Sequence, residues 1–420
     1  MLRYLSVLAL AVLSMTIVSA QQPPVPDAAL MARAKTLQKQ TPLIDGHNDF
    51  AWALRENNPQ RDLDLLDISK PQPSIMTDIP RLRAGELGAQ FWSVYVPVTL
   101  QGQTAVTATL EEIDTVYRMM RRYPDTFELA RTPEDVDRIF KQGKIASMIG
   151  VEGGHSIDNS LGALRMLFAL GARYMTLTHE KNTDWADSCT DTPKFDGLAP
   201  FGEEVVREMN RLGMLVDLSH TAPATMEDAI RVSVAPVIFS HSDAKALNPV
   251  PRNVPDNVLQ MLRQNGGVVM VTFVPGFLSP EVTAWNKAQD AERARLTSLH
   301  PNDAAAVKAG VDAWTAGNPM PRATVSDIAD HIDHIRQVAG IDHIGIGSDF
   351  DGITQVPLGM EDVSTYPKLT AELLRRGYTD ADVRKILGEN LLRVWRQVDV
   401  VAKKLQAERG PSTALFTPGS

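Results

Sequence analysis

The chain has 420 residues, of which 44% are hydrophobic, and its formal net charge is −9. This length and composition suit one large domain or two ordinary domains with a sizeable buried core. The acidic balance argues against a nucleic-acid-binding surface. The only cysteine is Cys189, so no disulfide bond can form within the chain.

Residues 1–20 have the pattern of a secretory signal peptide. Arg3 precedes an apolar run over residues 5–18, and Val18-Ser19-Ala20 fits a small-residue cleavage site. The run is shorter than the roughly 20 apolar residues of a membrane span, and an uncleaved anchor is the alternative. The sequence therefore predicts a secreted or periplasmic protein whose mature part, residues 21–420, has no membrane span.

Apolar segments alternate with helical patterns along the mature chain. Continuous apolar runs suit strands that are buried on both faces. Thr132 and Pro133 supply an N-cap and a first helical residue for one of the intervening helices. The predicted strands cover residues 43–49, 90–97, 145–152, 174–179, 214–220, 236–241, 267–274 and 343–349.

Eight such strands, each followed by a helix, predict one (β/α)8 TIM-like barrel over residues 21–420. In this fold the active site lies at the carboxyl ends of the strands. A doubly wound open sheet is the alternative, but it would more often carry a glycine-rich phosphate loop after the first strand. No such loop follows residues 43–49.

A polar, alanine-rich insertion at residues 279–321 interrupts the alternation between the seventh and eighth strands. Helical patterns cover residues 281–296 and 303–315 within it. Because the insertion follows the carboxyl end of a strand, we expect it to lie over the active-site mouth. An ornamental surface hairpin is the other interpretation.

Metal-ligating side chains end most of the predicted strands. Residues i and i+2 of a strand point to the same face, so His47 and Asp49 should project together. An isolated His-x-Asp pair is a weak signal, but the construction recurs at other strand ends. The candidate residues are His47, Asp49, Glu152, His179, His220, His241 and Asp349.

The carboxyl ends of the strands converge on one mouth of a barrel, so these side chains should meet there. Imidazole and carboxylate groups are good ligands for a hydrolytic divalent metal. A two-metal site activates a water and polarises the scissile carbonyl, without a covalent enzyme intermediate. A serine nucleophile is poorly supported because no G-x-S-x-G motif occurs.

The remaining histidines have structural interpretations. His155 follows a strand end and is expected to stabilise a loop. His331, His334 and His343 are expected on a helix face or at a strand start, at the opposite end of the barrel. His300 lies in the insertion and is expected to be exposed.

Several motifs together resemble the membrane dipeptidase (renal dipeptidase) family of zinc metallopeptidases, over residues 43 to 394. They read DGHND, GVEGGHS, TLTHEKNTDWAD, VDLSH, FSHSDA followed by Pro251-Arg252-Asn253, and GIGSDFDG. The resemblance implies a (β/α)8 barrel of the metal-dependent hydrolase type. It also implies a homodimer and a dipeptide as the substrate.

The resemblance further implies two zinc ions in each subunit. His47 and Asp49 would bind the first ion, and His220 and His241 the second. Glu152 would bridge the two ions together with a water or hydroxide.

The resemblance assigns three residues to the substrate. His179 would stabilise the tetrahedral oxyanion, and Arg252 would hold the C-terminal carboxylate, for which its planar fork is suited. Asp349 would contact the amine or shuttle a proton. Further substrates implied are dipeptides with a D-residue at the C-terminal position and dehydropeptide or β-lactam-like compounds.

Three features depart from the animal members of that family: Lys181 replaces a cysteine, Phe277 replaces a tyrosine, and the insertion is long. A deaminase or a phosphotriesterase-like hydrolase of the amidohydrolase kind is the nearest alternative function. Such enzymes typically begin with His-x-His, whereas this chain has His-x-Asp. A non-enzymatic periplasmic binding barrel is the third interpretation.

Overall fold

The computed structural model describes residues 27–418. The predicted signal peptide, residues 1–20, lies outside the described residues and stays a prediction. Within residues 27–418, no helix has the length and the apolar character needed to cross a membrane.

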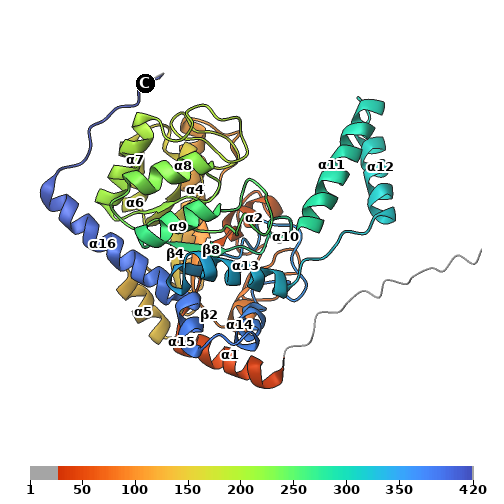
Figure 1. The fold of residues 1–420 in the computed structure, drawn as a ribbon, viewed down its shortest axis with the longest axis horizontal. Coiled ribbons are helices and arrows are strands. Elements are labelled where there is room, and N and C mark those ends of the chain that lie inside the picture. Colours follow the sequence, from red (N-terminus) through yellow and green to blue (C-terminus); the bar gives the residue numbers. More distant parts are fainter. Residues whose placement is uncertain (1–26, 419–420) are drawn as a thin grey trace, which may run out of the picture.

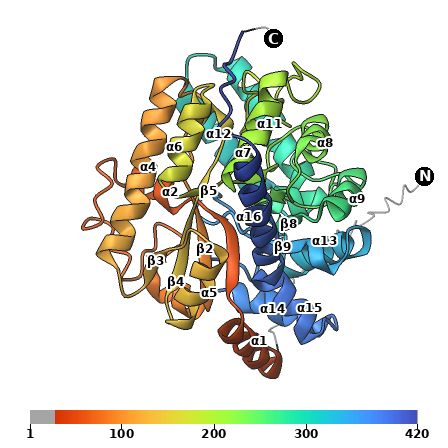
Figure 2. The same ribbon diagram turned by 90° about the vertical axis from the view of Figure 1, so that its left-hand side faces the viewer.

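The strands form a parallel sheet that closes on itself, because β2 pairs with both β1 and β4. The circle follows the order β1, β2, β4, β5, β6, β7, β8 and β9, and β9 pairs with β1. The predicted (β/α)8 barrel is therefore confirmed (Figures 1 and 2). The barrel strands are β1 Leu43–Asn48, β2 Leu87–Ser93, β4 Ile145–Val151, β5 Ala172–Thr176, β6 Leu215–Asp217, β7 Ile238–Phe239, β8 Val268–Val271 and β9 Ile344–Ile346.

The ninth strand, β3 (Phe127–Leu129), pairs only with the start of β4. It lies outside the circle, and the sequence did not predict it.

Several strands end earlier than predicted, so the candidate site residues other than His47 lie just beyond them. β6 ends at Asp217, whereas the predicted strand ran to residue 220. The Asp217 carboxylate accepts hydrogen bonds from the backbone N–H groups of Ser219 and Ser240. At the mouth end of β6, the Asp217 carboxylate thus takes the place of a backbone acceptor on a neighbouring strand. The backbone after Asp217 can therefore leave the sheet and turn toward the site.

Helices surround the barrel (Figure 2). Most begin at a side-chain cap or a proline; for example, Thr132 caps α5 by accepting from the backbone N–H of Asp135. The helices are α1 Ala28–Gln40, α2 Phe50–Asn57, α3 Ile79–Ala84, α4 Gln103–Arg122, α5 Pro133–Lys141, α6 Leu161–Ala169, α7 Pro200–Leu212, α8 Pro223–Val232, α9 Asp256–Asn265, α10 Pro275–Leu278, α11 Pro280–Leu299, α12 Ala304–Gly317, α13 Val325–Val338, α14 Tyr366–Arg375, α15 Asp380–Arg384 and α16 Asn390–Glu408. Short 3-10 turns cover Gly154–Ile157 and Ile341–His343, and a π-helical turn covers Lys385–Glu389.

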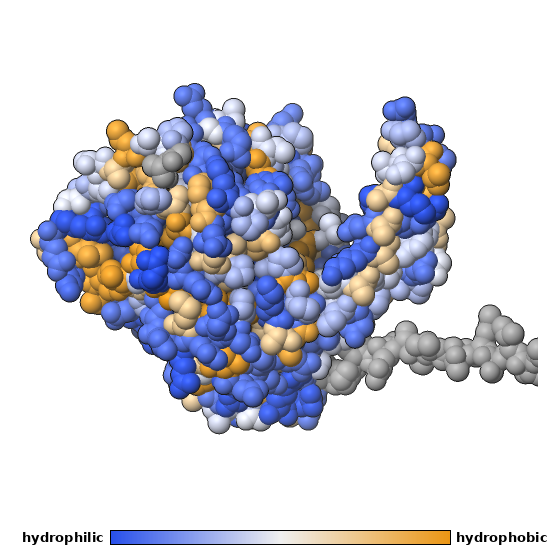
Figure 3. Space-filling model, turned by 45° about the horizontal axis from the view of Figure 1, so that its top comes forward, coloured by the Kyte–Doolittle hydropathy of each residue, from blue (hydrophilic) through white to orange (hydrophobic). Residues whose placement is uncertain are grey.

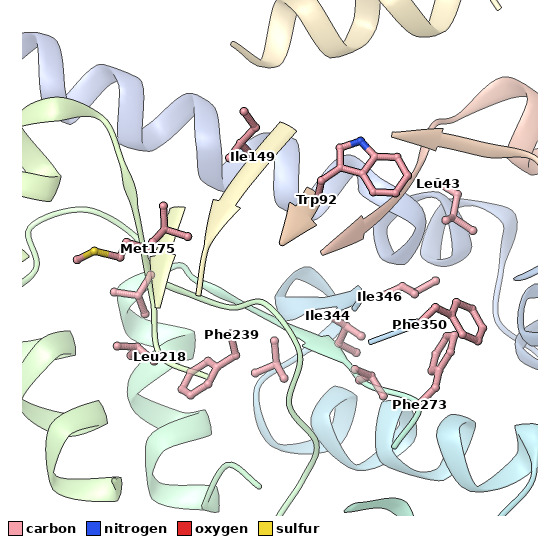
Figure 4. Packing of buried hydrophobic residues seen from close by; sticks show 14 of the residues in the cluster. Leu43, Trp92, Ile149, Met175, Leu218, Phe239, Phe273, Ile344, Ile346 and Phe350 are labelled. Carbon is pink, nitrogen blue, oxygen red and sulfur yellow. The ribbon is translucent and has the colours of Figure 1, made fainter. Parts of the chain in front are cut away.

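Alternate strand residues divide the core into two layers. Met148 and Tyr174 belong to the cluster inside the barrel, whereas their neighbours Ile149 and Met175 belong to the cluster between strands and helices. Figure 4 shows part of the outer layer around the strands. Trp395 of α16 packs with the inner cluster, and its ring lies 6.1 Å from that of Phe91.

Helices α11 and α12 form a hairpin that stands apart from the barrel body (Figures 1 and 3). The helical prediction for the insertion is confirmed. Along these two helices only Val282, Leu296 and Val311 are buried, and Trp285 faces Trp314 at 5.5 Å. The position of the insertion over the mouth stays a prediction.

Candidate metal centre and substrate site

The mouth of the barrel brings all seven strand-end candidates together. Three groups of them have ligand atoms within 4.8 Å of one another: His47, Glu152 and His241; Glu152, His179 and His220; and His47, Asp49 and Asp349. Glu152 belongs to two groups and His47 to two, so the three groups form one continuous cluster.

Glu152 faces both halves of the cluster with different oxygen atoms. Its Oε2 lies 3.4 Å from Nε2 of His47. Its Oε1 lies 3.1 Å from Nε2 of His220 and 3.5 Å from Nε2 of His241. A carboxylate in this position can offer one oxygen to each of two metal ions.

Asp49 and Asp349 complete the side of the cluster near His47. Oδ2 of Asp49 lies 3.2 Å from Nε2 of His47. Asp349 has a φ of +68°, a strained conformation for a non-glycine residue that often marks functional sites. A Cβ atom at Gly352 would lie 2.3 Å from Oδ2 of Asp49 and 2.5 Å from Oδ1 of Asp349. Glycine at this position therefore makes room for both carboxylates.

His220 also has a left-handed backbone, with a φ of +65°. Its carbonyl oxygen accepts hydrogen bonds from the hydroxyls of Thr178 and Ser188 and from the backbone N–H of Cys189. These contacts hold the backbone in a conformation that turns the ring toward His241. The two Nε2 atoms lie 3.0 Å apart.

Burial and charge favour the ligand forms of Glu152, His220 and His241. For His47, burial is outweighed by the nearby Tyr174, Glu152 and Asp49, which raise its pKa well above the ordinary value. Burial, with the nearby Arg252 charge, lowers the pKa of both His220 and His241 well below the ordinary value, which keeps them neutral. Burial alone would raise the pKa of Glu152, but the surrounding imidazoles, His47 foremost, hold it well below its usual range. Burial raises the pKa of Asp349 well above the ordinary value, so Asp349 favours its protonated form.

The donor set fits a divalent transition metal. Nε2 of His47 and Oδ1 of Asp49 are buried without a hydrogen-bond partner among the described residues. Unpaired buried polar atoms are costly unless a ligand satisfies them. Imidazole nitrogens and carboxylate oxygens in this arrangement suit zinc and similar ions.

Two of the imidazole rings are supported by hydroxyl groups that no sequence pattern predicted. The Tyr174 hydroxyl lies 2.9 Å from Nδ1 of His47. The Ser240 hydroxyl lies 2.8 Å from Nδ1 of His241 and donates to Asp217. Both nitrogens are therefore engaged away from the cluster, which leaves each Nε2 facing it.

His179 lies at the edge of the cluster, with Nε2 3.7 Å from Oε1 of Glu152. Its ring lies 4.9 Å from that of Tyr95, which contacts the Trp52 ring edge-on at 5.2 Å. Tyr95 and Trp52 thus form a partly exposed aromatic wall beside His179.

Arg252 is 5% exposed and lies beside the cluster. Its guanidinium donates to the Ser242 hydroxyl at 3.3 Å and to the His241 carbonyl at 3.2 Å. It also lies over the Phe277 ring, 5.2 Å from its centre. No carboxylate of residues 27–418 forms an ion pair with it, although the carboxyl groups of Asp243 and Asp349 lie close enough to interact with its charge.

Hydrogen bonds fix the loop that carries Arg252. Asn253 donates to the carbonyls of Asn248 and Phe277, and Asn248 donates to the Gly276 carbonyl. The loop is therefore tied to α10, directly after β8.

The position predicted for His331 was wrong. Its Nδ1 accepts from the backbone N–H of Ala244, and its Nε2 contacts the carbonyl of Leu278. Both partners follow strand carboxyl ends, so His331 lies at the mouth end of the barrel. The prediction failed because His331 lies in the middle of the long helix α13, from where its ring reaches groups at the mouth end.

The other histidines lie away from the cluster's ligand atoms. His155 contacts the Val96 carbonyl in a buried loop, as predicted, and His300 is exposed. His334 contacts Asp256, and His343 contacts the Gly267 carbonyl at the start of β8.

With this geometry, comparison with known proteins settles the family. Residues 31–409 match the family model described as membrane dipeptidase (peptidase family M19). The chain belongs to the membrane dipeptidase family. It is a metallo-dipeptidase, and the match disfavours the deaminase, phosphotriesterase and binding-barrel alternatives.

Solved structures of similar proteins agree with this membership. The probable dipeptidase PvdM from Pseudomonas aeruginosa is 27% identical, with a TM-score of 0.77, covering 89% of this chain and 99% of that one. The dipeptidase AC of family M19 is 27% identical, with a TM-score of 0.70, covering 85% and 98%. A metallo peptidase from Rhodobacter sphaeroides, liganded with a phosphinate mimic of the dipeptide L-Ala-D-Ala, is 26% identical, with a TM-score of 0.70, covering 85% and 99%.

Proposed function

We propose that this membrane dipeptidase family member uses two zinc ions at the strand ends to hydrolyse dipeptides into two amino acids. His47 and Asp49 would hold the first ion, His220 and His241 would hold the second, and Glu152 would be shared by both. The single observation that carries the proposal is that the two oxygens of Glu152 face opposite halves of the cluster. Bound zinc ions supply a nucleophilic water at neutral pH and polarise the scissile carbonyl.

The chain's own residues then orient the dipeptide. Arg252 binds the free C-terminal carboxylate, which supplies an ion-pair partner for its guanidinium. His179 donates a hydrogen bond to the oxygen that becomes negative during attack. Asp349 favours its protonated form because it is buried, so it can give a proton to the leaving amine.

The substrate range is part of the same proposal. The Rhodobacter sphaeroides relative binds a mimic of L-Ala-D-Ala, which supports acceptance of a D-residue at the C-terminal position here. Dehydropeptide and β-lactam-like compounds belong to the proposed range as well. Assays with L-Ala-L-Ala and L-Ala-D-Ala should show release of alanine from both, and hydrolysis of the L,L dipeptide alone would limit the range.

Glu152→Gln tests the bridging role. The substitution keeps the size of the side chain but removes the charge that both ions share, so we expect it to lose zinc and activity together. Zinc is measured by elemental analysis of the purified protein, and activity by amino-acid release. A Glu152→Gln protein with both ions at full occupancy and near-normal turnover would contradict the proposal.

Export by residues 1–20 and assembly as a homodimer stay predictions. Comparing the N-terminal residue of the secreted protein with Gln21 tests the first. Light scattering of the purified protein tests the second.

A further inference from the structure

Two hydroxyl groups contact imidazole rings of the candidate metal cluster on the side away from its ligand atoms, and each contacts a different ring. The Tyr174 hydroxyl, from β5, lies 2.9 Å from Nδ1 of His47, which belongs to β1. Both side chains are fully buried. Because β5 and β1 are not neighbours in the sheet, the tyrosine ring crosses the barrel interior to reach the histidine.

Gly150 of β4 makes this crossing possible. A Cβ atom at residue 150 would lie 2.0 Å from Cζ of Tyr174 and 2.4 Å from its hydroxyl oxygen. Real atoms do not approach this closely, so any side chain at residue 150 would displace the ring. Space for the ring is therefore a sufficient reason for glycine at this position.

The second hydroxyl belongs to Ser240 and lies 2.8 Å from Nδ1 of His241. It donates to Oδ2 of Asp217 at 2.6 Å, and Asp217 also accepts from the backbone N–H of Ser240. Nδ1 of His241, the serine hydroxyl and the buried carboxylate thus form a chain of hydrogen bonds.

The third imidazole of the proposed metal ligands lacks such support. Nδ1 of His220 has no hydrogen-bond partner among residues 27–418. Its orientation depends on the backbone contacts to its carbonyl oxygen described above. The two proposed metal positions therefore have one hydroxyl-supported histidine each, His47 on one side of Glu152 and His241 on the other.

We propose that Tyr174 and Ser240 are positioning residues, each of which fixes the metal-binding imidazole of one of the two metal positions. This inference rests on the proposed function. When Nε2 of a histidine binds a metal, Nδ1 carries the hydrogen and needs an acceptor. Each hydroxyl oxygen accepts that hydrogen, sets the tautomer and holds the ring plane. Without it, a buried N–H would be left unsatisfied.

The measured quantity is the zinc dissociation constant of each metal position. A residue that only fills space would not weaken one position while sparing the other. Zinc is titrated into the metal-free full-length chain in competition with a chromophoric chelator, which yields both dissociation constants. Tyr174→Phe keeps the ring and should weaken one binding event about 10- to 100-fold while the other is unchanged. Ser240→Ala should weaken the other event by a similar factor.

A background variant assigns each event to its position. Asp49→Ala removes a proposed ligand beside His47, so the remaining tight position is that of His220 and His241. In this background Tyr174→Phe should have no further effect on the remaining dissociation constant, whereas Ser240→Ala should still weaken it. This cycle separates the two hydroxyls by position.

Gly150→Ala provides an independent way to move the Tyr174 ring. The protein should show the same selective loss as Tyr174→Phe, and combining the two should add little. If Gly150→Ala fails to fold, Tyr174→Phe alone still tests the proposal. Tyr378→Phe is the matched control, because this buried tyrosine donates to Asp333 and should leave both constants unchanged.

The outcomes separate this inference from the proposed function. A wild-type protein that binds no zinc contradicts the proposed function. A wild-type protein that binds two zinc ions, with Tyr174→Phe and Ser240→Ala indistinguishable from it, overturns only the positioning roles. Equal weakening of both events in either variant also overturns them, because it shows a general loss of structure.

Discussion

Arg252 is a buried cation whose described surroundings contain hydroxyl, carbonyl and aromatic groups but no paired carboxylate. Burying an unpaired charge is costly, so such a residue is expected where a ligand brings the opposite charge. The free carboxylate of a dipeptide is such an anion. A fixed cation one residue beyond the scissile bond would favour a dipeptide, because a longer chain has no free carboxylate at that position.

We therefore expect Arg252→Ala to lower kcat/KM on a dipeptide and to leave the zinc content intact. A charge-assisted hydrogen bond contributes about 1.5 to 3 kcal/mol, which is about one to two orders of magnitude in kcat/KM. Amidating the C-terminus of the substrate removes the same interaction, so Arg252→Ala should have little effect on the amidated dipeptide. The measurement is kcat/KM for both enzymes on both substrates.

Arg263→Ala is the control for this cycle, because Arg263 is exposed on α9 and its replacement should leave kcat/KM at the wild-type value on both substrates. Equal loss on the free and amidated substrates would assign Arg252 a structural role and place the carboxylate elsewhere.

The sequence identified the strand-end residues for a physical reason. Parallel strands of a barrel end at one mouth, so a residue such as His241 could be placed from its position in the chain alone. The partner of a ring nitrogen depends instead on which side chain crosses the interior. The contact between Tyr174 and His47 joins strands that are far apart in the chain and also requires Gly150, so no local pattern predicts it.

The hairpin of α11 and α12 is connected at its base to the loop that carries Arg252. It begins directly after α10, which carries Phe277 beneath Arg252. The Thr283 hydroxyl donates to the Gly276 carbonyl, and Asn248 of the Arg252 loop donates to Thr283. The first turn of α11 thus contacts the loop that carries Arg252, whereas the rest of the hairpin stands apart (Figure 1).

We expect that replacing residues 285–318 by a short glycine-serine linker will change substrate length preference and spare the metals. The cut retains Val282 and Thr283, so the contacts to the Arg252 loop remain. If the hairpin borders the mouth, its loss should admit tripeptides or alter KM. Hydrolysis of a dipeptide and tripeptide series, with zinc analysis, measures this; an unchanged profile would mean that the hairpin is a surface ornament.

For the whole chain, the alternation of apolar segments and helices predicted the barrel but missed several short elements, among them β3 and α2. β3 has three residues and pairs at one end of β4, so it leaves almost no periodic signal. α2 (Phe50–Asn57) begins directly after Asp49, and the sequence did not predict a helix there. Both elements are short, and their place is decided by what they pack against.

α2 and α4 are joined by a partly buried pair, Arg55 and Glu112, that should make the stability of the whole chain depend on pH. Oε1 of Glu112 accepts from Arg55 at 2.8 Å, while its Oε2 is buried without a partner among the described residues. Burial raises the pKa of Glu112 from 4.5 to about 7, and the nearby Arg55 opposes this only in part. Folding therefore favours the protonated carboxyl group.

The sign of the pH effect follows from that shift. The folded chain binds more protons than the unfolded chain between pH 4.5 and about 7, so the stability from this group is complete below pH 4.5 and is lost as the pH rises through about 7. The loss is about 3 kcal/mol at most.

Glu112→Gln has no carboxyl group to ionise, so its unfolding midpoint should fall less over this range than that of the wild type. The measurement is thermal unfolding of both proteins at a series of pH values, and Glu111→Gln is the control. Hydrogen bonding to Arg61 lowers the pKa of Glu111, so that variant should keep the wild-type slope between pH 4.5 and about 7. Parallel curves for the wild type and Glu112→Gln would show that Glu112 is already ionised in the folded chain.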